Sequence, residues 1–307
     1  MTIFLTLVLN LIPLYILIAI GYVAGRWLHI DKNSLARLVI FIFMPITVFG
    51  FVVNMDLKLI YSFLPLLVFI VPSIIAFITL FLGRRIFGDT RANLLAMSAS
   101  MGNTGFFGLP LVSLLFEDKW VALYIFMMIG GSVFEATVGY YLAARGNFTV
   151  RDSLIKLSKF PALYAIALAI IINISDVTLP ESFYTYWGYF KGCYIVGGMM
   201  IIGIALSHMD KLVFGARFIS ITFIGKFAAW PLLVLVFIAL DKTLLHWFEP
   251  MVHQLIIVMS IVPPAANVVA FATQMNLRPE KAATTILLGT VFALFYIPLI
   301  LMWAGIR

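Results

Sequence analysis

Long apolar stretches alternate with short polar segments along the whole chain. About ten of these stretches are long enough to cross a bilayer, because a helical crossing needs roughly 20 mostly apolar residues. They are expected near residues 4–26, 35–54, 60–82, 92–115, 120–143, 160–175, 192–207, 214–240, 252–275 and 283–304. The pattern predicts an all-α polytopic membrane protein with ten transmembrane helices.

Two of the stretches are interrupted at their centres, at matching places in the two halves of the chain. The first interruption is Gly102, Asn103 and Thr104, and the second is Pro263 and Pro264, leading to Asn267. Glycine and a proline pair both interrupt the hydrogen-bond ladder of a helix. In a bilayer, the freed backbone groups are tolerated only inside protein or beside a watery cavity. A matched pair of broken helices therefore indicates a transporter binding site.

The polar stretch between residues 144 and 159 divides the predicted helices into five and five. We expect a first five-helix repeat at residues 1–145, a cytoplasmic linker at 146–158 and a second five-helix repeat at 159–307. Because each half crosses the membrane an odd number of times, the second copy must enter it upside down. The two halves are thus predicted to be inverted repeats.

The composition excludes a soluble globular protein, since 64% of the 307 residues are hydrophobic, only 11% are charged and the mean hydropathy is +1.12. The net charge of +7 does not indicate a nucleic-acid partner, because the basic residues stand at helix ends rather than in one patch. Cys193 is the only cysteine, so no disulfide forms within the chain. The lipid bilayer is the expected surrounding, and a homodimer is left open.

The basic residues in the loops predict the orientation. One set of loops holds 14 of them: Arg26, Lys32, Arg37, Arg84, Arg85, Arg91, Arg145, Arg151, Lys156, Lys159, Lys211, Arg217, Arg278 and Lys281. The other side holds 5: Lys58, Lys119, Lys191, Lys242 and Arg307. The imbalance predicts a multi-pass protein of the plasma or inner membrane with the first set in the cytoplasm and both termini outside.

The two breaks carry groups suited to a small polar ligand. Asn103 offers an amide, Thr104 a hydroxyl, and Asn267 a second amide one turn after the proline pair. The half-helix that begins at the second break presents its positive dipole end near mid-membrane, which suits an anion. A tightly packed helix and a simple proline kink are the alternatives. The matched breaks favour a substrate site formed by Gly102, Asn103, Thr104, Pro263, Pro264 and Asn267.

Glu135 and Lys226 are the two charges expected deep in the membrane, in the fifth and eighth stretches. Buried charges are costly, so they usually pair with one another or serve a function. Two interpretations stand side by side: an ion pair that fixes helix packing, and a direct role in substrate or ion coupling. In the second, Lys226 supplies a fixed positive charge or Glu135 binds a proton.

An intramembrane enzyme is not expected, because no deep aspartate pair, no His-Glu-x-x-His and no buried Ser-His pair occurs in the predicted helices. No cofactor and no metal site are expected, since no His has metal-ligand spacing to another His or to the cysteine. A passive channel is an alternative, although its pore would carry rings of polar residues rather than two breaks.

The motif Asn103-Thr104-x-x-x-Gly108-x-Pro110 resembles the fourth-helix signature of the auxin efflux carrier family. Pro263-Pro264-Ala265-Ala266-Asn267 resembles that family's ninth helix, and the resemblance covers essentially the whole chain. It implies ten helices in two inverted repeats, as in sodium–bile acid symporters, with helices four and nine crossed at their breaks. Helices one, two, six and seven would form a scaffold, and the other six a moving domain of the elevator type.

The resemblance also implies a secondary carrier of a small organic anion. Bacterial members are similar to malonate and malate permeases, and plant members export auxin. This chain has Gly102 where plant members have proline, and it lacks their long central loop. Those departures weaken the transfer of auxin as the substrate and of control by phosphorylation. The expected anion is a monocarboxylate, a dicarboxylate or an auxin-like acid. A sodium-coupled symporter of the bile-acid type and a passive anion channel are the alternatives.

Overall fold

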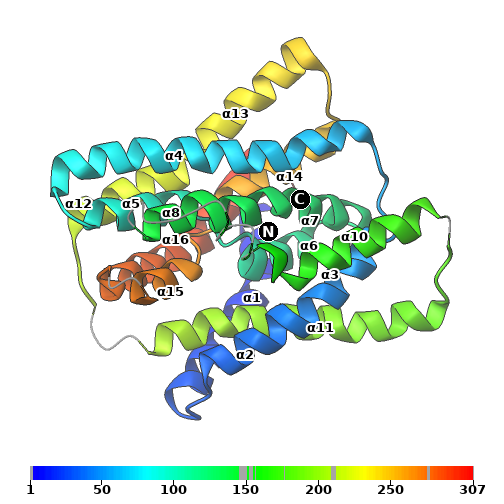
Figure 1. Ribbon diagram of the computed structural model, residues 1–307, viewed down its shortest axis with the longest axis horizontal. Helices are drawn as coiled ribbons and strands as arrows, with labels where there is room; N and C mark the ends of the chain where they lie inside the picture. The colour runs from blue at the N-terminus through cyan, green and yellow to red at the C-terminus, as the bar shows by residue number, and fades with distance from the viewer. Residues whose placement is uncertain are drawn as a thin grey trace.

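Helices make up the regular structure of the described part of the chain, apart from one isolated backbone bridge (Figure 1). The computed structural model describes residues 3–144, 151, 155, 157–175, 177–208, 212–274 and 277–306. The protein is therefore all-α, as the hydropathy pattern predicts. Most of the predicted linker at 146–158 lies outside the described residues.

The helices follow the predicted apolar stretches, several of them in two or more pieces. In chain order they are α1 (Ile3–Arg26), α2 (Lys32–Leu38), α3 (Met44–Val52), α4 (Phe63–Phe87), α5 (Arg91–Ser100), α6 (Leu109–Leu115), α7 (Asp118–Phe134), α8 (Tyr140–Ala143), α10 (Pro161–Ile174), α11 (Glu181–Ser207), α12 (Ala216–Phe223), α13 (Trp230–Leu240), α14 (Pro250–Ile261), α15 (Asn267–Gln274) and α16 (Pro279–Trp303). A 3-10 turn, η2 (Leu59–Ser62), precedes α4. Short π-helical segments are η1 (Val39–Phe43), η3 (Thr104–Gly108), η4 (Glu135–Gly139), η5 (Ile224–Ala229) and η6 (Asp241–Leu245).

Seven helical segments of the described chain are long and apolar enough to cross a membrane. They are Phe4–Arg26, Lys32–Val52, Leu59–Phe87, Asp118–Ala143, Glu181–Ser207, Ala216–Leu245 and Pro279–Trp303. Shorter apolar helices are Thr104–Leu115, Pro161–Ile174 and Pro250–Ile261. Two of these shorter helices adjoin the predicted breaks, because a break leaves each half-helix below the length of a full crossing. The chain is thus a multi-pass membrane protein.

The seventh predicted helix begins earlier than its apolar pattern indicates. We expected it at 192–207, whereas α11 starts at Glu181 and includes a turn rich in tyrosine, glycine and lysine. Tertiary packing stabilises this extension, because the buried Trp187 ring packs edge-on against Phe51 and its Nε1 donates to the carbonyl oxygen of Thr47 at 3.0 Å. Aromatic and polar residues dilute the hydropathy of a helix without ending it.

Two groups of helices are recognisable in the structure (Figure 1). In the first, α11 packs along α1 and against α3, which in turn packs against α10. In the second, α4 packs against both α5 and α7, and α15 packs against α16. Glycines bring α1 and α11 into backbone contact: a Cβ on Gly21 would strike Met200, and one on Gly203 would strike Ile18. Small residues allow such close approach in membranes, where packing rather than water drives association.

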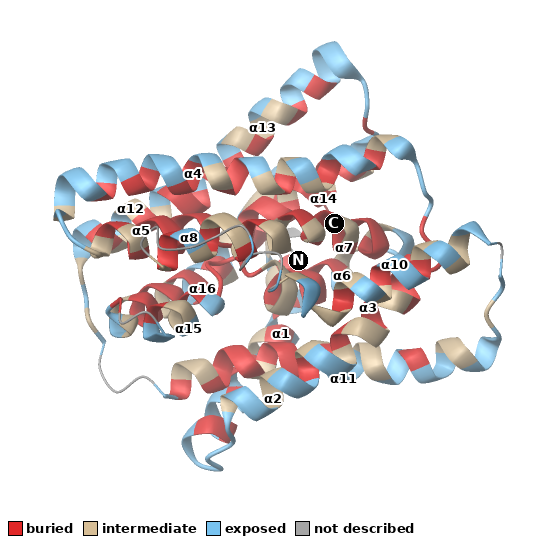
Figure 2. Cartoon of the chain, in the orientation of Figure 1, coloured by how far each residue is buried: buried red, intermediate tan, exposed pale blue. Residues whose placement is uncertain are grey.

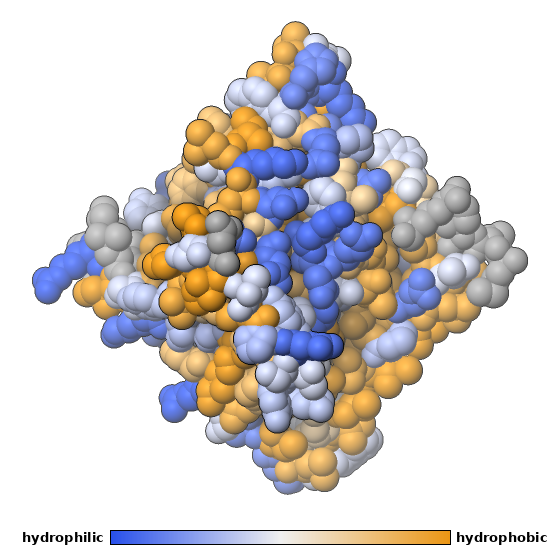
Figure 3. Space-filling model, turned by 90° about the vertical axis from the view of Figure 1, so that its right-hand side faces the viewer, coloured by the Kyte–Doolittle hydropathy of each residue, from blue (hydrophilic) through white to orange (hydrophobic). Residues whose placement is uncertain are grey.

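The outward faces of the helices are exposed and apolar. Figure 2 shows the pale-blue, exposed side of α4, α11 and α13 turned away from the other helices, with buried residues within. Phe77 and Phe81 on α4 and Leu232 on α13 are all more than half exposed. Such a surface suits lipid rather than water. Figure 3 views one end of the molecule, where hydrophilic residues run down the middle of the face and hydrophobic ones lie beside them.

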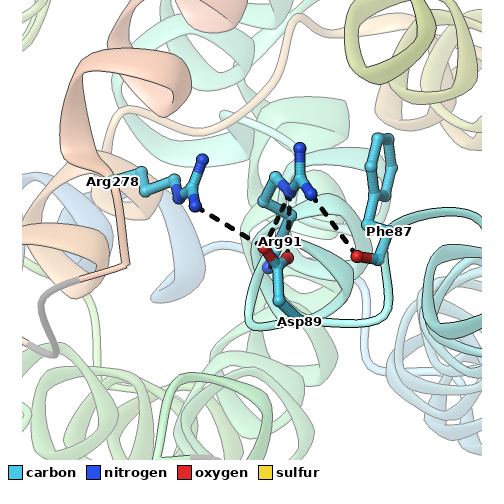
Figure 4. Close-up of polar contacts among 4 residues, drawn as sticks. All are labelled: Phe87, Asp89, Arg91 and Arg278. Carbon is cyan, nitrogen blue, oxygen red and sulfur yellow. Dashed lines mark hydrogen bonds and ion pairs between the residues drawn. The ribbon is translucent and has the colours of Figure 1, made fainter.

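An ionic contact ties the loop before α5 to the loop before α16 (Figure 4). The Asp89 carboxylate accepts from Nε of Arg91 at 2.9 Å and lies 3.5 Å from a guanidinium nitrogen of Arg278. Arg91 also lies against the Phe87 ring, 5.0 Å from its centroid. This contact fixes the ends of two helices that border the predicted binding region.

Candidate functional site

The two predicted breaks meet in the structure. α5 ends at Ser100 and α14 at Ile261, and the extended segments that follow run antiparallel, with a bridge between Gly102 and Pro264. The amide of Asn103 donates to the carbonyl oxygen of Pro263 at 2.8 Å, and the amide of Ala265 donates to the carbonyl oxygen of Met101 at 2.9 Å. The proximity of 102–104 to 263–267 that the matched motifs predict is confirmed.

Asn103 turns the chain at the first break. Its φ of −77° and ψ of 62° are those of an inverse γ-turn, and the amide of Thr104 donates to the carbonyl oxygen of Gly102 at 2.8 Å. The chain then resumes as the π-helical η3, in which the amide of Gly108 donates to the carbonyl oxygen of Asn103 at 2.9 Å. π-Helical turns are rare and frequently occur at functional sites.

The backbone donors at the breaks are largely used by the protein itself. Besides the amides of Asn103, Thr104 and Ala265, the amide of Val268 donates to the carbonyl oxygen of Ala265 at 3.1 Å. The sequence predicts a half-helix at the second break whose positive dipole end suits an anion. In the structure the amides of Asn103 and Ala265 bond to the opposite break and those of Thr104 and Val268 bond within their own, because unpaired amides inside a membrane protein are costly. These four amides are therefore occupied by acceptors of the protein itself.

Close packing accounts for the glycine at position 102. A Cβ there would lie 3.1 Å from Cγ2 of Val262 and 3.2 Å from both Nζ of Lys226 and Cη2 of Trp230. Those distances are tighter than ordinary van der Waals contact, so a side chain at 102 would have to displace the lysine or its neighbours. Gly102 thus lets the bridge form directly beside a buried charge.

A cavity of about 100 Å³ lies next to the bridge. Residues of both helix groups line it: Ile40, Met44, Gly102, Asn103, Thr104, Gly105, Phe106, Met128, Gly131, Ser132, Glu135, Phe160, Tyr194, Ala265 and Asn267. Amide, hydroxyl and carboxyl groups thus share one small space with apolar side chains. That combination is typical of a binding site for a small molecule.

Glu135 and Asn267 form a polar contact at the cavity. The side-chain amide of Asn267 donates to Oε2 of Glu135 at 3.2 Å. Glu135 begins the π-helical η4, and Asn267 is the first residue of α15. A carboxylate and an amide predicted independently, 132 positions apart in the chain, are therefore direct neighbours.

Lys226 belongs to the π-helical η5 and lies next to Gly102 of the bridge. Its side chain is fully buried, and Nζ donates to the carbonyl oxygen of Ser260 at 2.9 Å. Nζ also lies 3.5 Å from the centroid of the Trp230 ring, a cation–π contact. The ion pairs among the described residues do not join Lys226 to Glu135, so the structure gives these two charges different neighbours.

Of two larger openings in the structure, the first shares lining residues with this cavity and the second does not. One of about 150 Å³ is lined by Glu135, Phe160 and Phe271, among others. Another of about 530 Å³ lies between the start of α2, the end of α11 and the helices α15 and α16, with Lys32, His208, Thr273 and Glu280 in its lining. The second opening lies at the end of the molecule that bears Lys32, one of the predicted cytoplasmic residues.

Most of the predicted site residues line the cavity in the structure, and three of them do not. Gly102, Asn103, Thr104, Glu135 and Asn267 line the cavity, whereas Pro263, Pro264 and Lys226 are buried and do not line it. Sequence reasoning missed Ser132 and Tyr194, which also line the cavity, and Ser260 and Trp230, which hold the lysine. No local motif marks these four, because their partners come from distant helices.

The chain is similar in sequence to membrane transport proteins. A family model described as membrane transport protein matches residues 6–301. An uncharacterized transporter of Methanocaldococcus jannaschii is 27% identical over 296 residues, which cover 92% of this chain and 94% of that relative. The family match includes both breaks and all the residues of the cavity. The chain therefore belongs to the membrane transport protein family, the family of the auxin efflux carriers.

Proposed function

We propose that this protein is a secondary carrier that moves a small organic anion across the cell membrane. The observation that carries the proposal is the Gly102–Pro264 bridge together with the cavity beside it. Two broken helices that meet deep in a membrane protein form the kind of site at which carriers bind substrate. Family membership supports the transport function, and the chemistry of the cavity supports the substrate class.

The polar groups suit a monocarboxylate or a dicarboxylate. In this proposal the side chains of Asn103, Thr104 and Asn267 donate hydrogen bonds to the anion, while Gly102 and the two prolines shape the space. The charge of Lys226, behind Gly102, adds a long-range attraction for an anion, since charges interact more strongly where water is excluded. A cavity of about 100 Å³ limits the bound portion to a small group such as a carboxylate.

We further propose ten transmembrane helices in two inverted five-helix repeats, with an elevator-type movement. Seven long and three shorter apolar helices support this count, and one broken helix in each half supports the repeat. The cavity lies between the group of α1, α3, α10 and α11 and the remaining helices. A sliding of one group against the other would carry the bound anion from one side to the other. The distribution of basic residues supports placing both termini outside the cytoplasm.

Coupling is proposed to depend on two charges, Lys226, which is fully buried, and Glu135, which is partly exposed. Lys226 acts as a fixed positive charge at the crossing of the broken helices, so that no sodium ion is needed there. Its bond to the carbonyl oxygen of Ser260 supports this role, because backbone carbonyls at unwound helices coordinate coupling cations in other carriers. Protons or exchange then drive transport, with Glu135 as the group able to bind a proton.

Counterflow in proteoliposomes tests the carrier proposal. Vesicles that contain the purified protein and are loaded with malonate or malate should accumulate labelled external anion transiently, and the uptake should saturate. Uptake that rises linearly with concentration and shows no counterflow indicates a channel instead. Measuring the same uptake with sodium and with potassium tests the coupling separately, since sodium dependence would contradict the role given to Lys226.

A further inference from the structure

Tyr194 supplies a buried hydroxyl to the cavity from a helix that carries none of the predicted site residues. It lies in the middle of α11, its side chain is fully buried, and it lines the cavity opposite the breaks. Its Oη has no hydrogen-bond partner among the described residues. A buried donor without an acceptor costs free energy, so such an atom in a folded protein needs a reason.

Gly105 of the first break lies directly beside this hydroxyl. A Cβ built on Gly105 would lie 3.5 Å from Tyr194 Oη and 3.6 Å from Cε of Met128. Glycine at 105 therefore leaves the space in front of the hydroxyl free of any side chain. The break supplies polar groups to the same cavity, because Asn103 and Thr104 precede Gly105 in the chain and also line it. An acceptor placed between the break and α11 would satisfy the tyrosine and the break residues together.

We infer that Tyr194 is a further substrate-binding residue, whose hydroxyl donates a hydrogen bond to a carboxylate oxygen of the transported anion. The inference rests on the proposed function, because it assumes that an organic anion binds in this cavity. A phenolic donor and a carboxylate form a charge-assisted hydrogen bond, which is stronger than one between neutral groups. The tyrosine also distinguishes a carboxylate from an apolar ligand of the same size, since only the carboxylate satisfies it.

The position of Tyr194 adds a second consequence. Asn103, Thr104 and Asn267 lie on the broken helices, whereas α11 packs with α1 and α3 in the other helix group. The hydroxyl therefore completes the set of anion ligands only while the two groups hold the arrangement of this structure. Affinity for the anion should accordingly differ between this arrangement and one in which the groups have moved.

The test uses the full-length protein, with malonate and malate as probes. Tyr194→Phe should weaken binding of the anion about tenfold in calorimetry, which corresponds to about 1.4 kcal/mol. The thermal midpoint of the ligand-free variant should equal or exceed that of the native protein, because the substitution removes an unpaired buried hydroxyl. A purely structural tyrosine would give the opposite change in stability.

Tyr124→Phe is the matched control. Tyr124 is also fully buried near the break, but its hydroxyl donates to the carbonyl oxygen of Thr104 at 3.2 Å. Its loss should therefore lower the thermal midpoint without ligand. A second variant, Gly105→Ala, places a methyl group at ordinary contact distance from Tyr194 Oη and should weaken anion binding while the protein still folds.

Each outcome decides between the two proposals. Unchanged affinity in Tyr194→Phe and in Gly105→Ala overturns the inference and leaves the carrier proposal standing. A ligand-free midpoint of Tyr194→Phe that falls as far as that of Tyr124→Phe also overturns it, since the hydroxyl then has a structural partner. If the native protein binds neither malonate nor malate and shows no counterflow with them, the proposed substrate class itself is wrong.

Discussion

Lys226 gives the carbonyl oxygen of Ser260 the hydrogen bond that Pro264 cannot supply. In a regular helix this carbonyl would accept from the amide four residues later, but proline at 264 has no amide hydrogen. Nζ of Lys226 donates to it instead, at 2.9 Å, from a different helix. The lysine thereby stabilises the C-terminal end of α14, where the helix dipole favours a positive charge. The break and the buried charge thus depend on each other.

Replacement of Lys226 by methionine should remove anion transport while the fold persists. Methionine keeps most of the side-chain volume, so little cavity forms. The carbonyl of Ser260 loses its hydrogen-bond donor, which destabilises the folded state by about 1–3 kcal/mol. Removal of a buried charge offsets part of this cost. We expect anion affinity to fall roughly tenfold or more, measured by calorimetry, and the thermal midpoint to change little.

The double variant Lys226→Met with Glu135→Gln separates the roles of the two charges. If the charges act independently, the double variant is at least as impaired in transport as either single variant. Recovery of both stability and transport in the double variant would instead support the ion-pair interpretation. Potassium in place of sodium should leave uptake by the native protein unchanged.

Gly102→Ala should disturb the crossing of the two broken helices. The added methyl group would approach Val262, Lys226 and Trp230 at 3.1–3.2 Å, all in a packed interior. Overpacking of this kind typically costs about 1–3 kcal/mol, so we expect a lower thermal midpoint together with weaker anion binding.

Gly188→Ala is the matched control for that variant, because a Cβ at Gly188 on α11 would meet no atom within 4 Å. Alanine favours a helix over glycine by about 1 kcal/mol, so this substitution should preserve or raise the midpoint. Equal midpoints for the two variants would contradict the packing argument.

Asn103→Ala and Asn267→Ala should each weaken anion binding. A hydrogen bond to a charged group contributes about 1.5–3 kcal/mol, so we expect a loss of roughly tenfold to a hundredfold in affinity. Asn173→Ala serves as the control, because its amide donates to the carbonyl oxygens of Val53 and Met55, away from the cavity. That variant should lose stability and keep its affinity. If Asn103→Ala and Asn267→Ala keep their affinity for the anion while Asn173→Ala loses it, the two predicted amides do not bind the anion.

Asp89 should make the stability of the protein depend on pH in the acid range. The hydrogen bond from Arg91 holds the pKa of the Asp89 carboxyl below its ordinary value of 3.8. The carboxylate therefore contributes stability above pH 3.8, and this contribution disappears as the pH falls through the lower pKa of the folded state. The midpoint difference between the native protein and Asp89→Asn should therefore shrink as the pH is lowered through 3.8 and below. A difference that stays constant over this range would show that the ionic contact contributes nothing.

Local sequence signals were sufficient to predict the helices and the two breaks. Apolar runs of sufficient length marked the helices, since a membrane helix must bury its own backbone polar groups over a fixed distance. Gly102 and the proline pair marked the breaks because neither residue type supports a continuous hydrogen-bond ladder. The same motifs indicated the family to which the chain belongs, and the match over residues 6–301 confirms it.

The partners of the buried groups could not be predicted in the same way. In soluble proteins, the alternation of polar and apolar residues shows which face of a helix is buried, but a membrane helix is apolar on every face. Gly188 and Gly203 illustrate the problem: both are glycines of α11, yet the first faces open space and the second touches α1. Nothing in the local sequence distinguishes them.

The sequence by itself thus determined the helical class, the positions of the two interruptions and the polar residues beside them. Only the tertiary structure decided that Lys226 bonds to Ser260 rather than to Glu135, that Glu135 contacts Asn267, and that Tyr194 directs an unpaired hydroxyl into the cavity. The physical reason is that hydropathy and helix breaking act over a few residues, whereas hydrogen-bond partners are selected by the packing of helices far apart in the chain.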